Sequence, residues 1–172
     1  QLLAEAGYAD GLNLELWTPV GRYLMDTQVA ENLQAQWAKA GINVKIRQWE
    51  FQALMSEVKK GEFDMVLLGW SPSTGDADQG LYPVFHSSQW PPASNRAHYS
   101  NATVDKLLED AKVEVDSEKR AELYKQAQQT IIDEAAWTFL YYPKQALAYR
   151  NNVSGIEVLP TEHILLEDVV KK

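Results

Sequence analysis

The chain has 172 residues and a formal net charge of −8, which argues against a nucleic-acid-binding protein because phosphate groups would repel it. It contains no cysteine, and this excludes thiol catalysis, disulfide bonds and cysteine-bound zinc or iron–sulfur clusters. With 45% hydrophobic residues, the chain is long enough to bury the core of one domain without a metal or a disulfide.

The first half of the chain alternates between strand and helix patterns. Apolar and polar residues alternate over residues 12–17 and again over 43–47, as in half-buried strands. Residues 23–40 and 51–58 have the spacing of amphipathic helices, and residues 63–68 form a third, short apolar strand. This order with short connections predicts a parallel sheet with right-handed crossovers, flanked by helices, in an α/β fold.

Residues 1–6 have the pattern of the end of a helix, which Gly7 stops. A chain that starts inside a helix is expected to come from a longer protein, so the lack of a visible signal peptide carries no information. The absence of cysteine does not fix the compartment either, because proteins without disulfides occur in both redox environments.

A long segment without periodicity follows the third strand, from Gly69-Trp70 to about Tyr99. So long an irregular segment in a compact domain usually has a function, such as a lid or a binding loop. Open α/β sheets bind their ligands beyond the carboxyl ends of the strands, and glycine at position 69 would let a ligand backbone approach closely. We therefore expect the functional site here.

Two helices are predicted after this loop. Their apolar stripes cover residues 104–111 and residues 121–135. Each is preceded by residues that commonly cap helices: Asn101 or Thr103 before the first, and Asp116 or Ser117 before the second.

Extended segments are predicted towards the end of the chain. Residues 137–142 are aromatic and apolar and predict a fourth strand, which Pro143 ends. A further strand is expected at 146–149 and a short extended piece at 156–159, before a mixed tail at 161–172.

Trp70 and Trp90 stand near the two ends of the loop. Core packing is the default for a tryptophan, but here an exposed aromatic wall against a ligand is a fair alternative. Ser71, Ser73 and Thr74 add hydroxyl groups beside Trp70.

Asp76 and Asp78 stand two residues apart in the loop, faintly like a calcium-binding loop. That motif would need a third oxygen ligand at Gly80 and a carboxylate at Ser87, so we reject calcium. Two interpretations stay open. The aspartates cap a turn or the following helix, or one of them holds a cationic group of a ligand.

Two arginines are candidates for binding an anionic group. Arg96 lies near the end of the loop, and it is either a solvated surface charge or a clamp for a ligand carboxylate. The second interpretation suits arginine, because its guanidinium binds two oxygens at once. Arg22 follows the first strand at the same edge of the expected sheet and is a secondary candidate.

Catalytic and metal-binding patterns are absent from the sequence. His86, His98 and His163 lack the spacing of helical metal ligands. There is no Gly-x-Ser-x-Gly elbow and no glycine-rich phosphate loop, and no carboxylate pair stands out from the many acidic residues. We therefore predict no catalytic residue, no metal site and no cofactor.

Several stretches carry a family pattern: the opening LLAEAGY, Gly21-Arg22-Tyr23, QAQWAKAGINVKI at 34–46, GEFDMVLLGW at 61–70, and the helix at 124–136. Together they resemble the C-terminal lobe of the peptide-type, family 5 solute-binding proteins of bacterial ABC importers. The resemblance spans nearly the whole chain. Its most specific part is the Asp-Met-apolar-Gly-Trp stretch that leads into an aspartate-rich loop.

This resemblance implies one lobe of a two-lobed, type II periplasmic-binding-protein fold, whose ligand is enclosed between the lobes by hinge closure. Residues 1–150 would form the C-terminal ligand-binding lobe, and 151–172 a tail returning towards the missing N-terminal lobe. An extended ligand would add to the sheet edge as a strand. The resemblance and the loop chemistry select these ligand-binding candidates: Gly69, Trp70, Ser71, Ser73, Thr74, Asp76, Arg96 and Arg22.

Within the family, residues 71–78 and Gln89-Trp90-Pro91-Pro92 look most like the glutathione-binding member. Dipeptide-binding relatives carry an aspartate near position 73, which holds the free amino group of the ligand. Here that position is a serine or threonine, so the resemblance implies glutathione or another modified peptide rather than a simple dipeptide.

The function implied is that of a non-enzymatic solute-binding component, periplasmic or extracellular and membrane-associated. Its partners would be a small glutathione-like peptide, the membrane permease of an ABC importer and the missing N-terminal lobe, with no nucleic acid. Alternatives are a dipeptide-binding relative, a nickel- or metallophore-binding relative that uses His86 or His98, and a carboxylate-dependent hydrolase. An isolated lobe that binds nothing measurable is a further possibility, because half a cleft has to offset the full cost of association.

Overall fold

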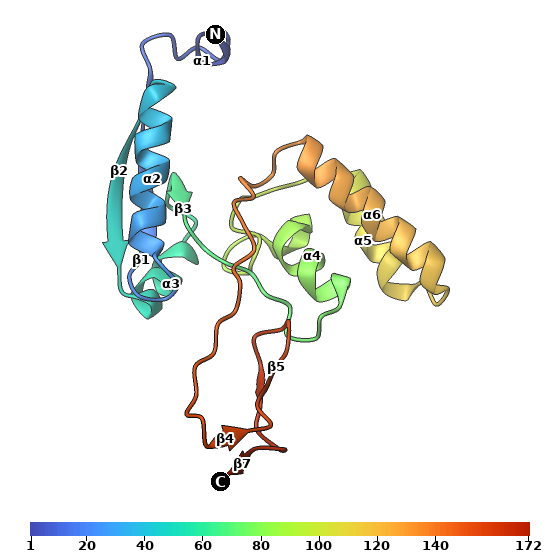
Figure 1. Ribbon diagram of the computed structural model, residues 1–172. Helices are drawn as coiled ribbons and strands as arrows, with labels where there is room; N and C mark the ends of the chain where they lie inside the picture. Colours follow the sequence, from blue (N-terminus) through green and yellow to red (C-terminus); the bar gives the residue numbers. More distant parts are fainter. The chain divides into compact units, whose positions relative to one another are not determined.

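A three-stranded parallel sheet organises the first 69 residues. A computed structural model describes residues 1–172 and gives strands β1 (Leu12–Pro19), β2 (Ile42–Trp49) and β3 (Met65–Val66) in the order β2-β1-β3. β1 pairs with β2 over all 8 of its residues, whereas β3 pairs with β1 at Leu16 and Trp17. The predicted parallel sheet is confirmed, although its third strand is shorter than expected (Figure 1).

Two helices lie between the strands, and a short one precedes them. They are α1 (Leu2–Glu5), α2 (Asp26–Lys39) and α3 (Phe51–Val58). α2 starts later than the sequence predicts, because the Asp26 carboxylate accepts hydrogen bonds from the backbone N–H groups of Arg22 and Tyr23 and so holds the preceding residues in a turn.

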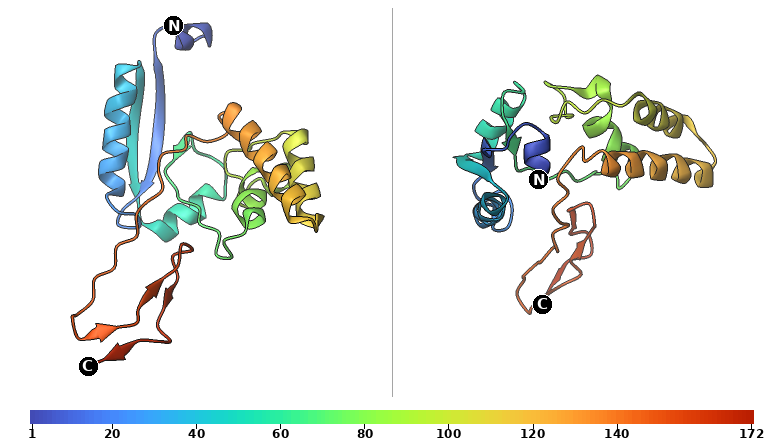
Figure 2. Two further views of the ribbon diagram at one scale, coloured as in Figure 1. Left: turned by 45° about the vertical axis from the view of Figure 1, so that its right-hand side comes forward. Right: turned by 90° about the horizontal axis from the view of Figure 1, so that it is seen from above.

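The two longer helices pack on opposite faces of the sheet. Successive residues of a strand point to opposite sides, and β1 uses this at Leu16 and Trp17. Leu16 packs with Ala30 of α2, while Trp17 packs with Leu54 and Val58 of α3. The helices therefore bury separate hydrophobic clusters on either side of β1, and α2 runs along one face of the sheet (Figure 2).

The chain divides into two compact units, Gln1–Gly69 and Trp70–Lys172. The second unit contains helices α4 (Ala77–Phe85), α5 (Ala102–Val113) and α6 (Ser117–Asp133), together with the 3-10 helix η1 (Ser87–Gln89). The expected boundary between residues 150 and 151 stays a prediction.

The loop expected to be irregular as far as Tyr99 contains α4 and η1, so that expectation is wrong over these residues. A helical stripe is present in the sequence as Ala77, Leu81, Val84 and Phe85, all of which belong to or pack on the core. Gly80 and Pro83 lie within this stripe and hide it, since both residues disfavour a helix interior.

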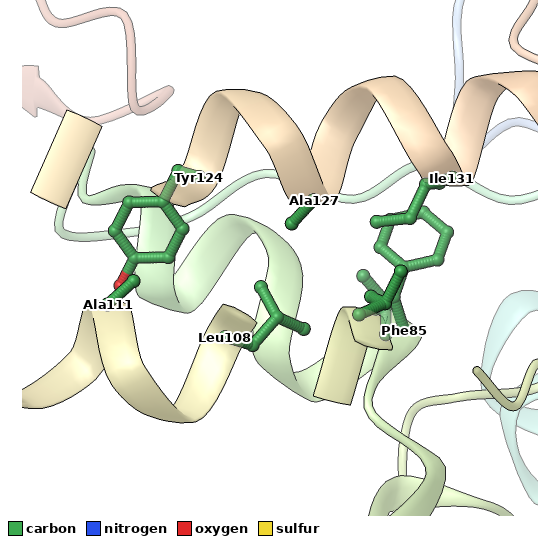
Figure 3. Close-up of a cluster of buried hydrophobic side chains, with 8 residues drawn as sticks. Phe85, Leu108, Ala111, Tyr124, Ala127 and Ile131 are labelled. Atoms are coloured by element: carbon green, nitrogen blue, oxygen red, sulfur yellow. The ribbon is translucent and has the colours of Figure 1, made fainter. Parts of the chain in front are cut away.

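The core of the second unit forms where α4, α5 and α6 meet. Figure 3 shows side chains of α6 directed towards Leu108 and Ala111 of α5 and Phe85 of α4. The complete cluster is Val84, Phe85, Val104, Leu108, Ala111, Tyr124, Ala127 and Ile131. Two of the predicted caps are confirmed, because Asn101 begins α5 and Asp116 begins α6 with side-chain oxygens that accept backbone N–H groups.

After α6 the chain contains only short strands. β4 (Val153–Ser154) pairs antiparallel with β7 (Val170–Lys171), and β5 (Glu157–Val158) pairs antiparallel with β6 (Ile164–Leu165). The strands predicted at 137–142 and 146–149 are absent. Their residues have the composition of strands but pair with no neighbouring strand here, and Tyr142 is 99% exposed.

No helix of the structure combines the length and the apolarity that crossing a bilayer requires.

The core of the second unit gives a stability prediction with a matched control. Val104→Ala removes buried methyl groups, and we expect it to lower the free energy of unfolding by about 2 kcal/mol through lost burial and a residual cavity. Val115→Ala makes the same deletion at a side chain that is 97% exposed, and it should cost less than about 0.5 kcal/mol. Urea unfolding of both variants checks this. Equal losses in the two variants would contradict the assigned core.

Candidate functional site

Gly69 is the last residue of the first unit, and the Tyr23 side chain lies directly against it. Its N–H donates a hydrogen bond of 2.8 Å to the Tyr23 hydroxyl oxygen. A Cβ at position 69 would lie 3.1 Å from ring carbon Cε1 of Tyr23. The space expected for a ligand backbone is thus bordered by a tyrosine ring. Tyr23 is a candidate that the sequence reasoning missed, although its Gly-Arg-Tyr motif was a visible signal.

Arg22 lies over two aromatic rings of the same unit. Its guanidinium carbon is 5.0 Å from the centroid of the Tyr23 ring and 5.2 Å from that of Phe51. This placement is favourable for a cation, because the face of an aromatic ring is negative. Arg22 is exposed and forms no ion pair within the chain, so its charge is available to an anionic group.

Buried Asp26 fixes the segment that carries these two side chains. Its Oδ2 accepts the backbone N–H groups of Arg22 at 2.9 Å and Tyr23 at 3.2 Å, and its Oδ1 accepts that of Thr27 at 2.9 Å. Burial acts to raise the pKa of Asp26, but these N–H groups outweigh it and hold the pKa below its usual value. Asp26 therefore stays ionised and keeps Arg22 and Tyr23 in place.

Trp70 opens the second unit and is 38% exposed, so it is not interred in a core. Its indole Nε1 donates a hydrogen bond of 2.9 Å to the carbonyl oxygen of Gln79. The bond fixes the ring while leaving part of it open to solvent. Trp90 is also exposed, and its Nε1 donates to the carbonyl oxygen of Tyr99 at 2.8 Å.

The hydroxyl groups beside Trp70 have different roles. Oε1 of Gln79 accepts the Thr74 N–H at 2.9 Å and the Thr74 hydroxyl at 3.0 Å, and it lies 3.2 Å from the Ser73 hydroxyl. Ser73 and Thr74 thus direct their hydroxyls onto the loop itself. Ser71 is exposed and forms no hydrogen bond within the chain, so its hydroxyl remains available.

The Asp76 carboxylate forms hydrogen bonds with two helices, α4 and α6. It begins α4 as the capping residue, with Oδ1 accepting the Asp78 N–H at 2.8 Å. Nη1 and Nη2 of Arg120 on α6 bind its two carboxylate oxygens at 3.1 and 2.7 Å. The Arg120 guanidinium, helped by the Asp78 N–H, lowers the pKa of Asp76. These bonds correspond to the capping interpretation of this carboxylate.

Arg96 lies in a segment that is shaped by its neighbour Asn95. The Asn95 side chain is fully buried and donates to the carbonyl oxygens of His86 at 3.0 Å and Tyr99 at 2.9 Å. Its Oδ1 accepts the Tyr99 N–H at 3.1 Å. Arg96 is half-buried beside it.

The histidines considered as metal ligands have other surroundings. His86 is buried, with Nδ1 2.8 Å from the Ser88 hydroxyl and Nε2 3.3 Å from Glu109. His98 packs edge-on against Trp90, with ring centroids 5.3 Å apart. Within the second unit the His86 ring is engaged in hydrogen bonds, and the His98 ring in packing.

The sequence pattern of the bacterial extracellular solute-binding proteins, family 5, middle region, matches residues 1–92, which is more than half of the chain. The chain belongs to this family. The match covers the whole parallel sheet, β3, Gly69-Trp70 and the loop as far as Pro92.

Other members of family 5 match this chain over nearly its full length. The glutathione-binding protein GsiB of Salmonella choleraesuis is 36% identical over 174 residues, which cover 98% of this chain and 34% of GsiB. The chain therefore spans about a third of the length of this curated relative. These homologues are solute-binding proteins, as the sequence predicts.

Solved structures of family relatives confirm the fold class. The oligopeptide-binding protein AppA of Bacillus subtilis, in complex with a nonapeptide, matches with a TM-score of 0.86 and 32% identity, over 100% of this chain and 36% of AppA. The dipeptide-binding protein of Pseudoalteromonas sp. SM9913, in complex with Met-Leu, matches with a TM-score of 0.80 and 26% identity, over 99% of this chain and 34% of that protein. This family 5 chain is thus an α/β part of a periplasmic-binding-protein fold.

The Asp76–Arg120 pair gives a pH-dependent prediction. Asp76→Asn keeps the capping oxygen and removes the charge. Because Arg120 lowers the folded-state pKa, the stabilisation is complete above the unfolded-state value of about 4 and is lost as the pH falls through the folded-state pKa. For a partly exposed pair we expect a Tm lower by a few degrees at pH 7, with a smaller difference at pH 2.

Calorimetric melting at the two pH values checks this prediction. Asp10→Asn is the control, because Asp10 is exposed and forms no ion pair. It should match wild type in Tm at both pH values. A deficit of Asp76→Asn that persists undiminished at pH 2 would show that the charge is not what stabilises the protein.

Proposed function

We propose that this chain is the C-terminal lobe of a two-lobed extracytoplasmic binding protein that captures a small, glutathione-like peptide for an ABC importer. The observation that carries the proposal is Trp70, which lies four residues beyond the end of β3, keeps part of its ring exposed and is fixed by its bond to Gln79. A fixed, exposed aromatic ring in a loop beyond a parallel strand suits recognition of a small ligand.

The choice of a glutathione-like ligand rests on similarity and on charge. GsiB, whose name states glutathione binding, is 36% identical to this chain. Glutathione carries two carboxylates and one ammonium group at neutral pH. Exposed Arg22 offers a cation for a carboxylate, whereas the Asp76 carboxylate is already paired with Arg120 rather than free for an ammonium group. Arg96 is a second candidate for a carboxylate.

The candidate ligand-binding residues fall into two groups on this proposal. In the second unit Trp70 and Ser71 offer an aromatic ring and a hydroxyl for recognition, and in the first unit Arg22 and Tyr23 offer a cation and a phenol. Ser73, Thr74 and Asp76 shape the loop, because their polar atoms bond to Gln79 and Arg120. Gly69 accommodates the Tyr23 ring.

The partners and the location follow from the same proposal. The protein would work outside the cytoplasm with the membrane permease of an ABC importer, and it would close on its ligand through the N-terminal lobe. No chemical step on the ligand is involved.

Calorimetric titration of the full-length protein tests the ligand. With reduced glutathione we expect a dissociation constant on the order of micromolar or tighter. Met-Leu and a nonapeptide serve as comparison ligands. Tight binding of either with no heat from glutathione would replace the glutathione proposal by dipeptide or oligopeptide binding.

Substitution of Trp70 tests the carrying observation. Trp70→Ala removes the exposed ring, and we expect it to weaken glutathione binding at least about tenfold, equivalent to ~1.4 kcal/mol. Tyr8→Ala, at an exposed aromatic residue in the turn before β1, is the control and should bind as wild type. If Trp70→Ala binds glutathione with wild-type affinity, the Trp70 ring does not contribute to the binding site.

A further inference from the structure

Pro83 lies inside α4, four residues after Gln79. In an α-helix the N–H of a residue bonds to the carbonyl oxygen four residues earlier. Proline has no N–H, and its ring pushes that earlier carbonyl away from the helix axis. The Gln79 carbonyl oxygen therefore lacks its helical partner.

The oxygen left without its helical partner is the one that holds Trp70. The Trp70 indole Nε1 donates to the Gln79 carbonyl oxygen at 2.9 Å. A buried or half-buried carbonyl needs a partner, and the indole, which is a donor only, supplies it. The Gln79 carbonyl oxygen therefore links the missing helical hydrogen bond at Pro83 to the orientation of the Trp70 ring.

The side chain of Gln79 also bonds to the loop between Trp70 and α4. Its Oε1 accepts both the N–H and the hydroxyl of Thr74, and its Nε2 lies 3.1 Å from the Ser73 hydroxyl. The Thr74 N–H can only donate, so the amide oxygen must face it. Thr74 in turn accepts the Asp76 N–H at 3.2 Å. The ten residues from Trp70 to Gln79 form a closed, internally bonded loop.

We propose that Gln79 and Pro83 are positioning residues for ligand recognition, because together they hold the Trp70 ring in one orientation before a ligand arrives. The inference rests on the proposed function of this loop and deepens it. A loop that is ordered in advance does not lose conformational freedom on binding, and affinity rises by the cost avoided. Neither residue needs to touch the ligand.

Two variants in the full-length protein separate this role from plain stability. Pro83→Ala restores an N–H that competes for the Gln79 carbonyl oxygen and removes a helix-breaking residue. We expect its Tm to equal or exceed that of wild type while glutathione binding weakens about threefold or more. Gln79→Met removes the side-chain bonds at similar volume, and we expect binding to weaken about tenfold.

Conservative and remote variants provide the controls. Gln79→Glu keeps an acceptor oxygen for Thr74 and suits the first turn of a helix, so it should recover binding to within about threefold of wild type. Gln126→Met makes the same glutamine-to-methionine change on the exposed face of α6 and should leave binding unchanged.

A spectroscopic readout decides the proposal without any ligand. In protein labelled with 5-fluorotryptophan, the Trp70 resonance is assigned by its loss in Trp70→Phe. We expect it to shift or broaden in Pro83→Ala and in Gln79→Met, but not in Gln126→Met. An unchanged Trp70 resonance in both test variants would overturn the positioning role. The role would also be overturned if glutathione affinity decreases only in variants whose Tm also decreases.

The same readout keeps the two proposals distinguishable. Full-length protein that binds no glutathione while its Trp70 resonance responds as expected would refute the ligand and leave the positioning role standing. Wild-type glutathione binding in every variant would refute the positioning role and leave the proposed ligand standing.

Discussion

β1 imposes the constraint on which the N-terminal unit depends, because it is the strand that hydrogen-bonds on both sides. Its neighbouring residues Leu16 and Trp17 each enter a separate cluster on opposite faces. Full burial of such a side chain is worth about 1.5–3 kcal/mol, and a slip of one residue would exchange the two faces. The register of β1 with β3 therefore sets which face of the sheet Met65 and Val66 present, just before the segment that leads to Gly69.

The polar residues after β3 serve mainly the loop that contains them. Serine, threonine and aspartate readily bond to nearby backbone groups, so in a loop they replace the hydrogen bonds of regular structure. The sequence could predict that these polar residues gather beyond a strand, beside Trp70. It could not predict that Arg120, 44 residues away, binds Asp76, since only the packing of α4 and α6 brings them together. Tyr23 beside Gly69 is likewise a long-range contact.

The fold was predictable where local pattern and final structure agree. The hydrophobic periodicity of the N-terminal half predicts the order of strands and helices that forms the parallel sheet. The caps Asn101 and Asp116 accept backbone N–H groups only two and three residues later in the chain. α4 was missed because Pro83 breaks the expected helical pattern for a reason that only the structure reveals, namely the indole that takes over the freed carbonyl. Strands at the end of the chain could not be judged from composition, because a strand exists only with a partner.

The stretch from 137 to 149 has one further consequence, for handling the protein. Phe139, Tyr142, Leu147 and Tyr149 are all more than 40% exposed on a backbone that pairs with no strand. Unpaired N–H and C=O groups beside aromatic and aliphatic side chains are a template for pairing with identical chains, and Pro143 is the main interruption. Residues 1–172 produced by themselves at high concentration would therefore be prone to aggregate through this segment, and charged substitutions there would be the first remedy.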